Sequence, residues 1–163
     1  MKKLTTPISD EEILSLDVGD QVYISGEIFT GRDAALPQLV ELIKENKLDF
    51  NIEGSAIMHT AVSDAGIAPT TSNKEEIEST IPFLSKNGVK IHLGKGMLHD
   101  DTIVSLKENN SIFVITPPVA ALLTSKVLKK ECVAFSNEGM EAMYKLEVEN
   151  IPGIVAVSNG RSI

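Results

Sequence analysis

The chain has 163 residues, of which 42% are hydrophobic and 23% are charged, and its formal net charge is −8. This length is typical of one globular domain, and such a domain buries enough surface to fold without disulfides or structural metals. The acidic balance argues against nonspecific binding to nucleic acid or to anionic membranes, but it does not exclude a local basic pocket.

The first half of the chain is predicted to mix short helices, strands and loops. Ser9 and Glu12 form a capping-box pattern ahead of the first helix. Pro37 lies in the helical pattern of the second helix and is tolerated only near a helix start. The predicted elements are, in chain order, a helix over 11–16, a strand over 21–29, a helix over 30–47, a strand over 55–62 and a loop over 63–71.

The second half is predicted to alternate helices and strands. Ser72 is the expected N-cap of a helix over 72–88, and Pro82 predicts a break or a kink inside it. The following elements are a strand over 89–94, a turn over 95–97, a helix over 100–110, a strand over 111–116, a helix over 119–130, a strand over 132–135, a helix over 137–150 and a strand over 153–158. This alternation favours βαβ units, a parallel sheet and a single domain over residues 1–163.

Cysteine and histidine positions do not favour a metal site. The single cysteine, Cys132, cannot alone ligate zinc or an iron–sulfur cluster, and the apolar stretch ECVAF predicts a buried strand thiol. The histidines, His59, His92 and His99, are widely spaced, and His92 is expected on the polar face of a strand. No window approaches the roughly 18 apolar residues of a membrane span, and the N-terminus has no apolar signal region. We therefore expect a cytoplasmic protein without membrane contacts.

Several predicted strand ends combine glycine or hydroxyl residues with positive charge. They occur in the stretches SGEIFTGRD, APTTSNK, GKGM and NGRS. In α/β sheets ligands bind outside the carboxyl ends of strands, so Arg32, Lys74 and Lys95 could converge there on an anion. Thr70 and Thr71 add hydroxyl groups to such a site. A simpler interpretation stays open, in which the threonines only cap a helix, the cations are solvated and GKG is a turn that needs glycine.

At these residues the sequence resembles a family. The stretches GDQVYISGEIFTGRDAA, PTTS, GKGM, AALL and GMEAMYKLEVENIPGIVAV are similar, in this order, to the β subunits of class I fumarases and L-tartrate dehydratases, and to the C-terminal domain of single-chain class I fumarases. The resemblance covers about residues 5 to 163. It implies an α/β fold, a three-layer β/β/α swivelling domain with a central, mostly parallel sheet.

The resemblance also implies an activity and a partner. The family's hydro-lyases interconvert a 2-hydroxy dicarboxylate, such as malate, and its enoate. Their [4Fe–4S] cluster is carried by the α subunit or the N-terminal domain, so this chain is expected to bind no cofactor alone and to act in a higher hetero-oligomer with an α subunit.

Site roles follow from the matched motifs. Arg32 matches the arginine of the RDAA stretch and is expected to bind a substrate carboxylate. Thr70 matches the family's proposed base, and Thr71 its neighbour in the substrate site. Lys95 matches the lysine of GKG, another substrate contact. Lys74 stands where the family has a substrate-binding arginine and keeps the charge without the planar fork.

The sequence departs from the family pattern at four places. Lys74 is one, Leu36 replaces a histidine, Pro117-Pro118 replaces a glycine pair, and MHTAV stands where HCGP is usual. Three alternatives therefore stay open: a fumarase-type β subunit, a tartrate dehydratase β subunit, and a noncatalytic paralogue that binds a small anion or serves assembly.

Overall fold

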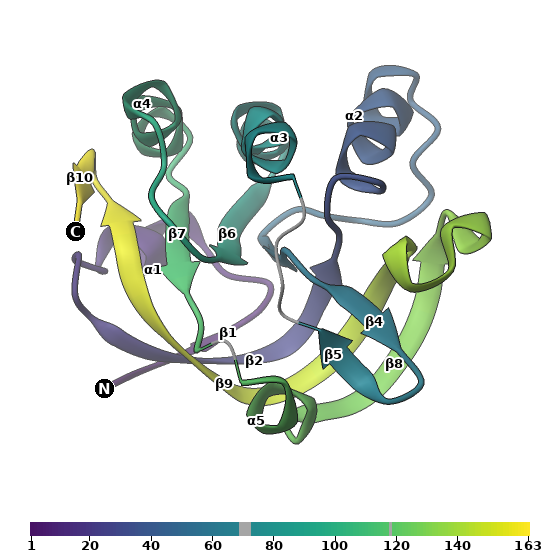
Figure 1. Cartoon of the computed structure of the whole chain (residues 1–163). Coiled ribbons are helices and arrows are strands. Elements are labelled where there is room, and N and C mark those ends of the chain that lie inside the picture. Colours follow the sequence, from purple (N-terminus) through teal and green to yellow (C-terminus); the bar gives the residue numbers. More distant parts are fainter. Residues whose placement is uncertain (69–72, 118) are drawn as a thin grey trace.

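Figure 1 shows the computed structural model of the chain, which describes residues 1–68, 73–117 and 119–163. Its elements are, in chain order, β1 (Lys2–Thr5), α1 (Asp10–Leu14), β2 (Gln21–Thr30), α2 (Leu36–Lys44), β3 (Ser55–Met58), β4 (Ala61–Ser63), β5 (Gly66–Ala68), α3 (Lys74–Lys86), β6 (Val89–Gly94), α4 (Asp100–Glu108), β7 (Ile112–Ile115), α5 (Ala120–Thr124), β8 (Val127–Ala134), the 3-10 helix η1 (Ser136–Glu141), β9 (Met143–Ser158) and β10 (Arg161–Ser162). Within these described ranges, no helix is long and apolar enough to cross a membrane.

Five strands close into a barrel. β2 pairs with β3, β3 with β6, β6 with β7 and β7 with β9, and β9 returns to pair with β2. The first four strands run parallel, whereas β9 runs antiparallel to both of its barrel neighbours. The predicted α/β class with a central sheet is confirmed. The predicted three-layer β/β/α arrangement is wrong, because the 16-residue β9 reaches from β2 to β7 and closes the sheet. The expected mostly parallel pairing holds for β2, β3, β6 and β7 of the barrel.

The barrel has an apolar interior and a helix-covered outer side. Helices α2, α3 and α4 lie side by side along one side, and α5 lies on the opposite side near the β4–β5 hairpin (Figure 1). On β3, Ala56 and Met58 join the interior cluster, while Ile57 packs outward with Leu39 and Leu84. Successive strand residues face opposite sides, so both faces of β3 are buried.

The predicted first half is largely confirmed. Ser9 caps α1, and its side chain accepts a hydrogen bond from the backbone N–H of Glu12. Pro37 lies in the first turn of α2. The predicted strand over 55–62 is interrupted at His59, and the predicted loop over 63–71 contains the short strand β5.

The structure differs from three expectations: the N-cap of α3, the effect of Pro82 on that helix and the burial of Cys132. The N-cap of α3 is Asn73, whose side chain accepts from Glu76 N, so the prediction of Ser72 is wrong by one residue. Pro82 lies inside α3 without breaking it. Cys132 is exposed and not buried, because β8 lies outside the barrel and pairs with β9 as an outer strand.

Two predicted helices near the C-terminus are wrong. The helix over 119–130 ends at Thr124, and β8 begins at Val127. The helix over 137–150 is replaced by η1 and the start of β9. Met143 and Leu146 have helical spacing, but Leu146 and Val148 also alternate with charged residues, as in a strand with one buried face. Pairing with β2 and β8 selects the strand.

Candidate functional site

The carboxyl ends of the parallel barrel strands meet at one edge. The loops that leave these strands continue the sheet: Gly31 N donates to Met58 O at 3.0 Å, His59 N to Leu93 O at 2.8 Å, and Thr116 N to Gly94 O at 3.3 Å. Arg32 follows β2 and Lys95 follows β6, so both lie in loops of this edge. We call this region the carboxyl edge.

Arg32 is mostly buried and pairs with the Glu141 carboxylate. Its side chain is 13% exposed, and its Nε donates to Glu141 Oε1 at 3.0 Å while its Nη2 donates to Glu141 Oε2. Two hydrogen bonds in parallel make this a bidentate, charge-assisted pair. The hydrogen bonds from Arg32 to Glu141 raise the pKa of the guanidinium above its ordinary value. Arg32 therefore stays charged and is held in a defined orientation.

The strand register explains why Arg32 and Glu141 meet. β2 and β9 run antiparallel, with Phe29 opposite Lys145. The Thr30 hydroxyl accepts a hydrogen bond from Tyr144 N at 3.2 Å. Beyond the contact between Thr30 and Tyr144, the segment that follows β2 runs next to the segment that precedes β9. Arg32 and Glu141 lie at this point, although 109 positions separate them in the sequence.

Lys74 is directed at the loop that carries Lys95. It is the first residue of α3, and its Nζ donates to the carbonyl of Met97. Gly96 has φ +88°, and a Cβ added there would lie 2.8 Å from Lys74 Cε. The lysine stem therefore packs directly on the backbone of this loop. Lys95 itself is exposed.

A buried carboxylate lies behind Lys74. Glu78 is 3% exposed, and its Oε1 lies 3.7 Å from Lys74 Nζ. Its Oε2 accepts from His99 N at 2.8 Å and from the Thr102 hydroxyl at 2.7 Å. These donors belong to the start of α4, where the helix dipole favours negative charge. Glu78 thus joins the N-terminus of α4 to α3 and to the Lys95 loop.

Two neutral histidines lie beneath the carboxyl edge. His59 and His92 are buried, with ring centroids 6.2 Å apart. Burial lowers the pKa of His59 to about 4, and burial with the neighbouring His59 lowers the pKa of His92 well below its ordinary value. The expectation that His92 faces a polar surface is wrong, because α3 covers it and Ser85 Oγ bonds its Nε2 at 2.8 Å.

The described residues contain no group of three or more His, Cys, Asp or Glu side chains that could hold a metal ion. His59 and His92 each keep one buried ring nitrogen without a hydrogen-bond partner in the described parts of the chain. His99 lies apart from them, and its Nε2 bonds the Glu75 carboxylate at 2.9 Å.

The structure brings together only some of the predicted site residues. Lys74 contacts the Lys95 loop, and Arg32 lies in another loop of the same edge. Thr70 and Thr71 lie outside the described residues, so their predicted roles stay predictions. Leu36, which replaces a family histidine, is fully buried at the start of α2.

Sequence reasoning missed Glu141, Glu78 and His59. Glu141 lies in the stretch GMEAM, where the sequence predicts a helix, and Glu78 lies in the middle of a correctly predicted helix. No signal marked His59 either, because the predicted strand runs over 55–62 and places His59 in its middle, whereas β3 ends at Met58 and His59 follows it at the carboxyl edge.

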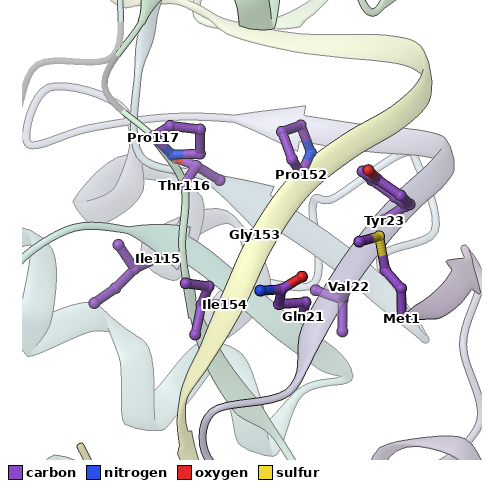
Figure 2. A pocket seen from close by; sticks show the side chains of 10 residues that line it. All are labelled: Met1, Gln21, Val22, Tyr23, Ile115, Thr116, Pro117, Pro152, Gly153 and Ile154. Atoms are coloured by element: carbon purple, nitrogen blue, oxygen red, sulfur yellow. The ribbon is translucent and has the colours of Figure 1, made fainter.

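A separate pocket of about 350 Å³ lies on the outside of the barrel (Figure 2). It crosses β9 between the start of β2 and the end of β7, and Tyr23, Pro117, Pro152 and Ile154 are among its lining residues. No Lys, Arg, Asp, Glu or His side chain among the described residues lines it. The pocket can hold an apolar group but offers no charge for an anionic ligand.

Comparison with known proteins identifies the family. The family described as Fumarase C-terminus matches residues 2–163. The chain belongs to this family. The resemblance predicted from the motifs is thereby confirmed.

The chain is similar to three relatives whose names indicate an activity. The chain is 34% identical to a "Putative L(+)-tartrate dehydratase subunit beta" of Methanocaldococcus jannaschii, over 96% of this chain and 87% of that protein. It is 31% identical to the "L(+)-tartrate dehydratase subunit beta" of Escherichia coli, over 96% of this chain and 83% of that protein. It is 30% identical to a "Putative fumarate hydratase class I" of Geobacillus stearothermophilus, over 98% of this chain but 33% of that protein.

Proposed function

We propose that this chain is the β subunit of a hydro-lyase that interconverts a 2-hydroxy C4 dicarboxylate and its dehydrated product. The observation that supports this most directly is a cationic carboxyl edge, with Arg32 held in a bidentate pair and Lys95 presented to solvent, in a chain of the fumarase C-terminus family. A dicarboxylate has two anionic ends, and two separated cations suit them.

The substrate is proposed from the relatives of similar length. Those relatives are named as tartrate dehydratase β subunits, and this chain covers most of their length. The class I fumarate hydratase relative is about three times as long. We therefore place L(+)-tartrate beside malate and fumarate as the substrates to test, and a noncatalytic anion-binding chain is the alternative that the test must exclude.

The residues of the chain have distinct proposed roles. Arg32 binds one substrate carboxylate through its planar fork, and Lys95 binds the other as a point charge. Lys74 holds the Lys95 loop through Met97 and adds positive charge to the substrate site.

Thr70 is the proposed base that accepts the proton next to a carboxylate, while the hydroxyl group leaves from the neighbouring carbon as water, and Thr71 is its proposed neighbour in the substrate site. A threonine hydroxyl is a weak base at neutral pH, so Thr70 needs a partner carboxylate, in its ionised form, to take up the hydroxyl proton.

An iron–sulfur cluster does not fit the described residues of this chain. Cys132 is exposed on an outer strand, and no metal-holding group of side chains accompanies it among the residues described. We propose that an α subunit carries the [4Fe–4S] cluster and that the two subunits form a hetero-oligomer. Every role assigned above to this chain is one of binding, positioning or proton transfer.

The test begins with the native complex. The tagged chain is purified anaerobically from its source together with any bound partner. Turnover of L(+)-tartrate, malate and fumarate is then measured for this complex. The same assays are run on the chain alone after it has been incubated with iron and sulfide. We expect turnover by the complex only. A stoichiometric cluster with turnover in the chain alone would refute the two-subunit proposal.

Variants then test the assigned residues within the complex. Thr70→Val is expected to abolish turnover mainly through kcat, while assembly is kept. Lys95→Ala should raise KM, whereas Lys129→Ala is the matched control because Lys129 is an exposed lysine on β8. Full activity of the Thr70→Val complex would favour the noncatalytic alternative.

A further inference from the structure

We propose that Glu78 is a positioning residue, which fixes the loop over 95–98 so that Lys95 meets a substrate carboxylate. This inference rests on the proposed function, in which Lys95 binds the substrate. It assigns a role to a buried carboxylate that no sequence motif selected, and it follows from how α3 holds the start of α4.

The loop over 95–98 has little backbone support of its own. It connects the end of β6 at Gly94 to His99, the N-cap residue of α4. No backbone–backbone hydrogen bond among the described residues involves positions 95 to 98, while Leu98 packs on an apolar cluster. Lys95 and Met97 are exposed. The conformation that presents Lys95 therefore depends on contacts from neighbouring elements, and α3 supplies them.

Glu78 caps α4 from another helix. In a capping box, a carboxylate at the third helical position accepts a hydrogen bond from the N-cap backbone N–H. The third position of α4 is Thr102, and its N-cap residue His99 makes no side-chain cap hydrogen bond. Glu78 Oε2 takes the place of that carboxylate, because it accepts from His99 N at 2.8 Å and from the Thr102 hydroxyl at 2.7 Å. The end of the loop is thereby fixed to α3.

The same carboxylate holds Lys74 against the middle of the loop. Glu78 Oε1 is buried without a hydrogen-bond partner among the described residues, and Lys74 Nζ lies 3.7 Å from it. The ammonium donates to the Met97 carbonyl, and the lysine stem packs on Gly96. Attraction to the buried carboxylate directs the ammonium toward the loop. Glu78 therefore acts on the loop twice, directly at His99 and through Lys74.

A fixed loop makes Lys95 a better ligand for the substrate. Lys95 directly follows β6 and lies two residues before Met97, so both sides of its backbone are held. Ordering a mobile backbone on binding costs conformational entropy, and a loop that is already ordered avoids this cost. The charge of Glu78 acts in the opposite direction, since a carboxylate near the site repels a dianionic substrate.

Glu78→Gln separates these two effects in the native complex, because it keeps the side-chain shape. The amide has one acceptor oxygen, and its NH2 group faces either the donors of α4 or the Lys74 ammonium, so one set of contacts is lost. If Glu78 positions Lys95, KM for the dicarboxylate that the complex turns over rises about tenfold with little change in kcat. If Glu78 acts only through its charge, KM falls, and that result overturns the proposal.

A double-mutant cycle shows whether the effect passes through Lys95. In the Lys95→Ala background, Glu78→Gln should change KM less than about twofold, because no ammonium is left to position. An equal rise of KM in both backgrounds overturns the proposal, as does a lower melting temperature with unchanged KM.

Glu75→Gln is the matched control. Glu75 also lies in the first turn of α3, but it bonds the ring of His99 and not its backbone N–H. Its substitution removes the same charge and should leave KM unchanged. A rise of KM equal to that of Glu78→Gln would show that the contact to the loop backbone is not what matters, and it would overturn the proposal.

Proteolysis reports on the loop independently of activity. Trypsin cleaves after lysine, and Lys95 is exposed in the loop, as Lys47 is exposed in the loop after α2. In the full chain, Glu78→Gln should speed cleavage after Lys95 about tenfold relative to cleavage after Lys47, as measured by mass spectrometry. An unchanged ratio of the two cleavage rates overturns the proposal.

A second variant and the wild type keep failure of the proposal apart from failure of the proposed function. If Glu78→Gln does not fold, Glu78→Asp keeps the charge but withdraws the carboxylate from His99, and it should raise KM and cleavage in the same way. A wild-type complex that turns over none of the three dicarboxylates contradicts the proposed function, and proteolysis still decides whether Glu78 holds the loop. An active wild type with unchanged KM in the Glu78 variants contradicts the positioning role alone.

Discussion

At the scale of single residues, the carboxyl edge combines charged groups at the surface with neutral imidazoles underneath. His59 follows β3 directly and lies against Gly94, where an added Cβ would be 2.8 Å from His59 Nδ1. Glycine at position 94 therefore makes room for the ring. Because burial keeps His59 and His92 uncharged at neutral pH, they add no positive charge that would compete with Arg32 and Lys95 for an anion.

The lowered pKa of His59 predicts loss of stability in acid. The folded pKa is about 4 and the unfolded value is about 6.5, so between these values the unfolded chain binds more protons. Stability is fully kept above pH 6.5 and falls as the pH decreases toward 4. From pH 7.5 to pH 5, His59 should account for a loss of roughly 2 kcal/mol in the free energy of unfolding.

Denaturant unfolding at pH 7.5 and pH 5 measures this effect for wild type and His59→Gln, which should lose less stability in acid. The control is His99→Gln, since the hydrogen bond that His99 Nε2–H donates to the Glu75 carboxylate raises the pKa of His99 and gives the opposite sign. His92 is expected to share the behaviour of His59. An equal acid loss in wild type and His59→Gln would show that His59 is not the titrating group.

At the scale of elements, the α3 N-terminus connects three parts of the site. Local patterns predicted the bounds of α3, β6 and α4 closely, because the residues that mark where each element begins and ends lie within or beside its own segment. The same patterns predicted a cation at position 74 near the anion site. They could not predict that Lys74 reaches the carbonyl of Met97, or that Glu78 turns its carboxylate toward α4, because these contacts depend on how two helices pack. The long-range contacts of a site are absent from any single window of sequence.

Lys74→Ala is expected to destabilise the protein as well as weaken substrate binding. It leaves Glu78 buried without its nearby cation and removes the bond to Met97, so the free energy of unfolding should fall by about 1–3 kcal/mol. Lys86→Ala, at the exposed end of the same helix, should change it by less than about 0.5 kcal/mol. Calorimetric unfolding compares the variants. Unchanged stability of Lys74→Ala would indicate a solvated lysine that holds no loop.

At the scale of the whole molecule, closure of the barrel is what sequence patterns could not predict. The alternation of strands and helices in the second half predicts a parallel sheet, and β6 and β7 confirm it. The same parallel pairing extends to β2 and β3 of the first half, which that prediction did not cover. The pairing of β9 with both β2 and β7 depends on strand order across the whole chain, and a strand of 16 residues was divided between a predicted helix and a short final strand. The closed ring is nonetheless what brings the start of β9, and hence Glu141, next to the end of β2.

Gly153 is the residue at which this closure can be tested. It lies opposite Val22 of β2, and two residues later Val155 lies opposite Val114 of β7, so β9 passes from one neighbour to the other here. A Cβ at position 153 would lie 2.4 Å from Val114 Cγ1 and 3.2 Å from the Ile115 carbonyl oxygen. Gly153→Ala should therefore lower the free energy of unfolding by about 1–3 kcal/mol through overpacking.

A second substitution identifies the cause. Val114→Ala removes the Cγ1 atom that the new methyl group would meet, so Gly153→Ala should cost much less in the Val114→Ala background than in wild type. Guanidinium unfolding of the four proteins gives the coupling, expected to be at least about 1 kcal/mol and of relieving sign. If the two substitutions change the free energy of unfolding additively, the methyl group introduced by Gly153→Ala and the Val114 side chain do not meet. The passage of β9 from β2 to β7 would then not require glycine at position 153.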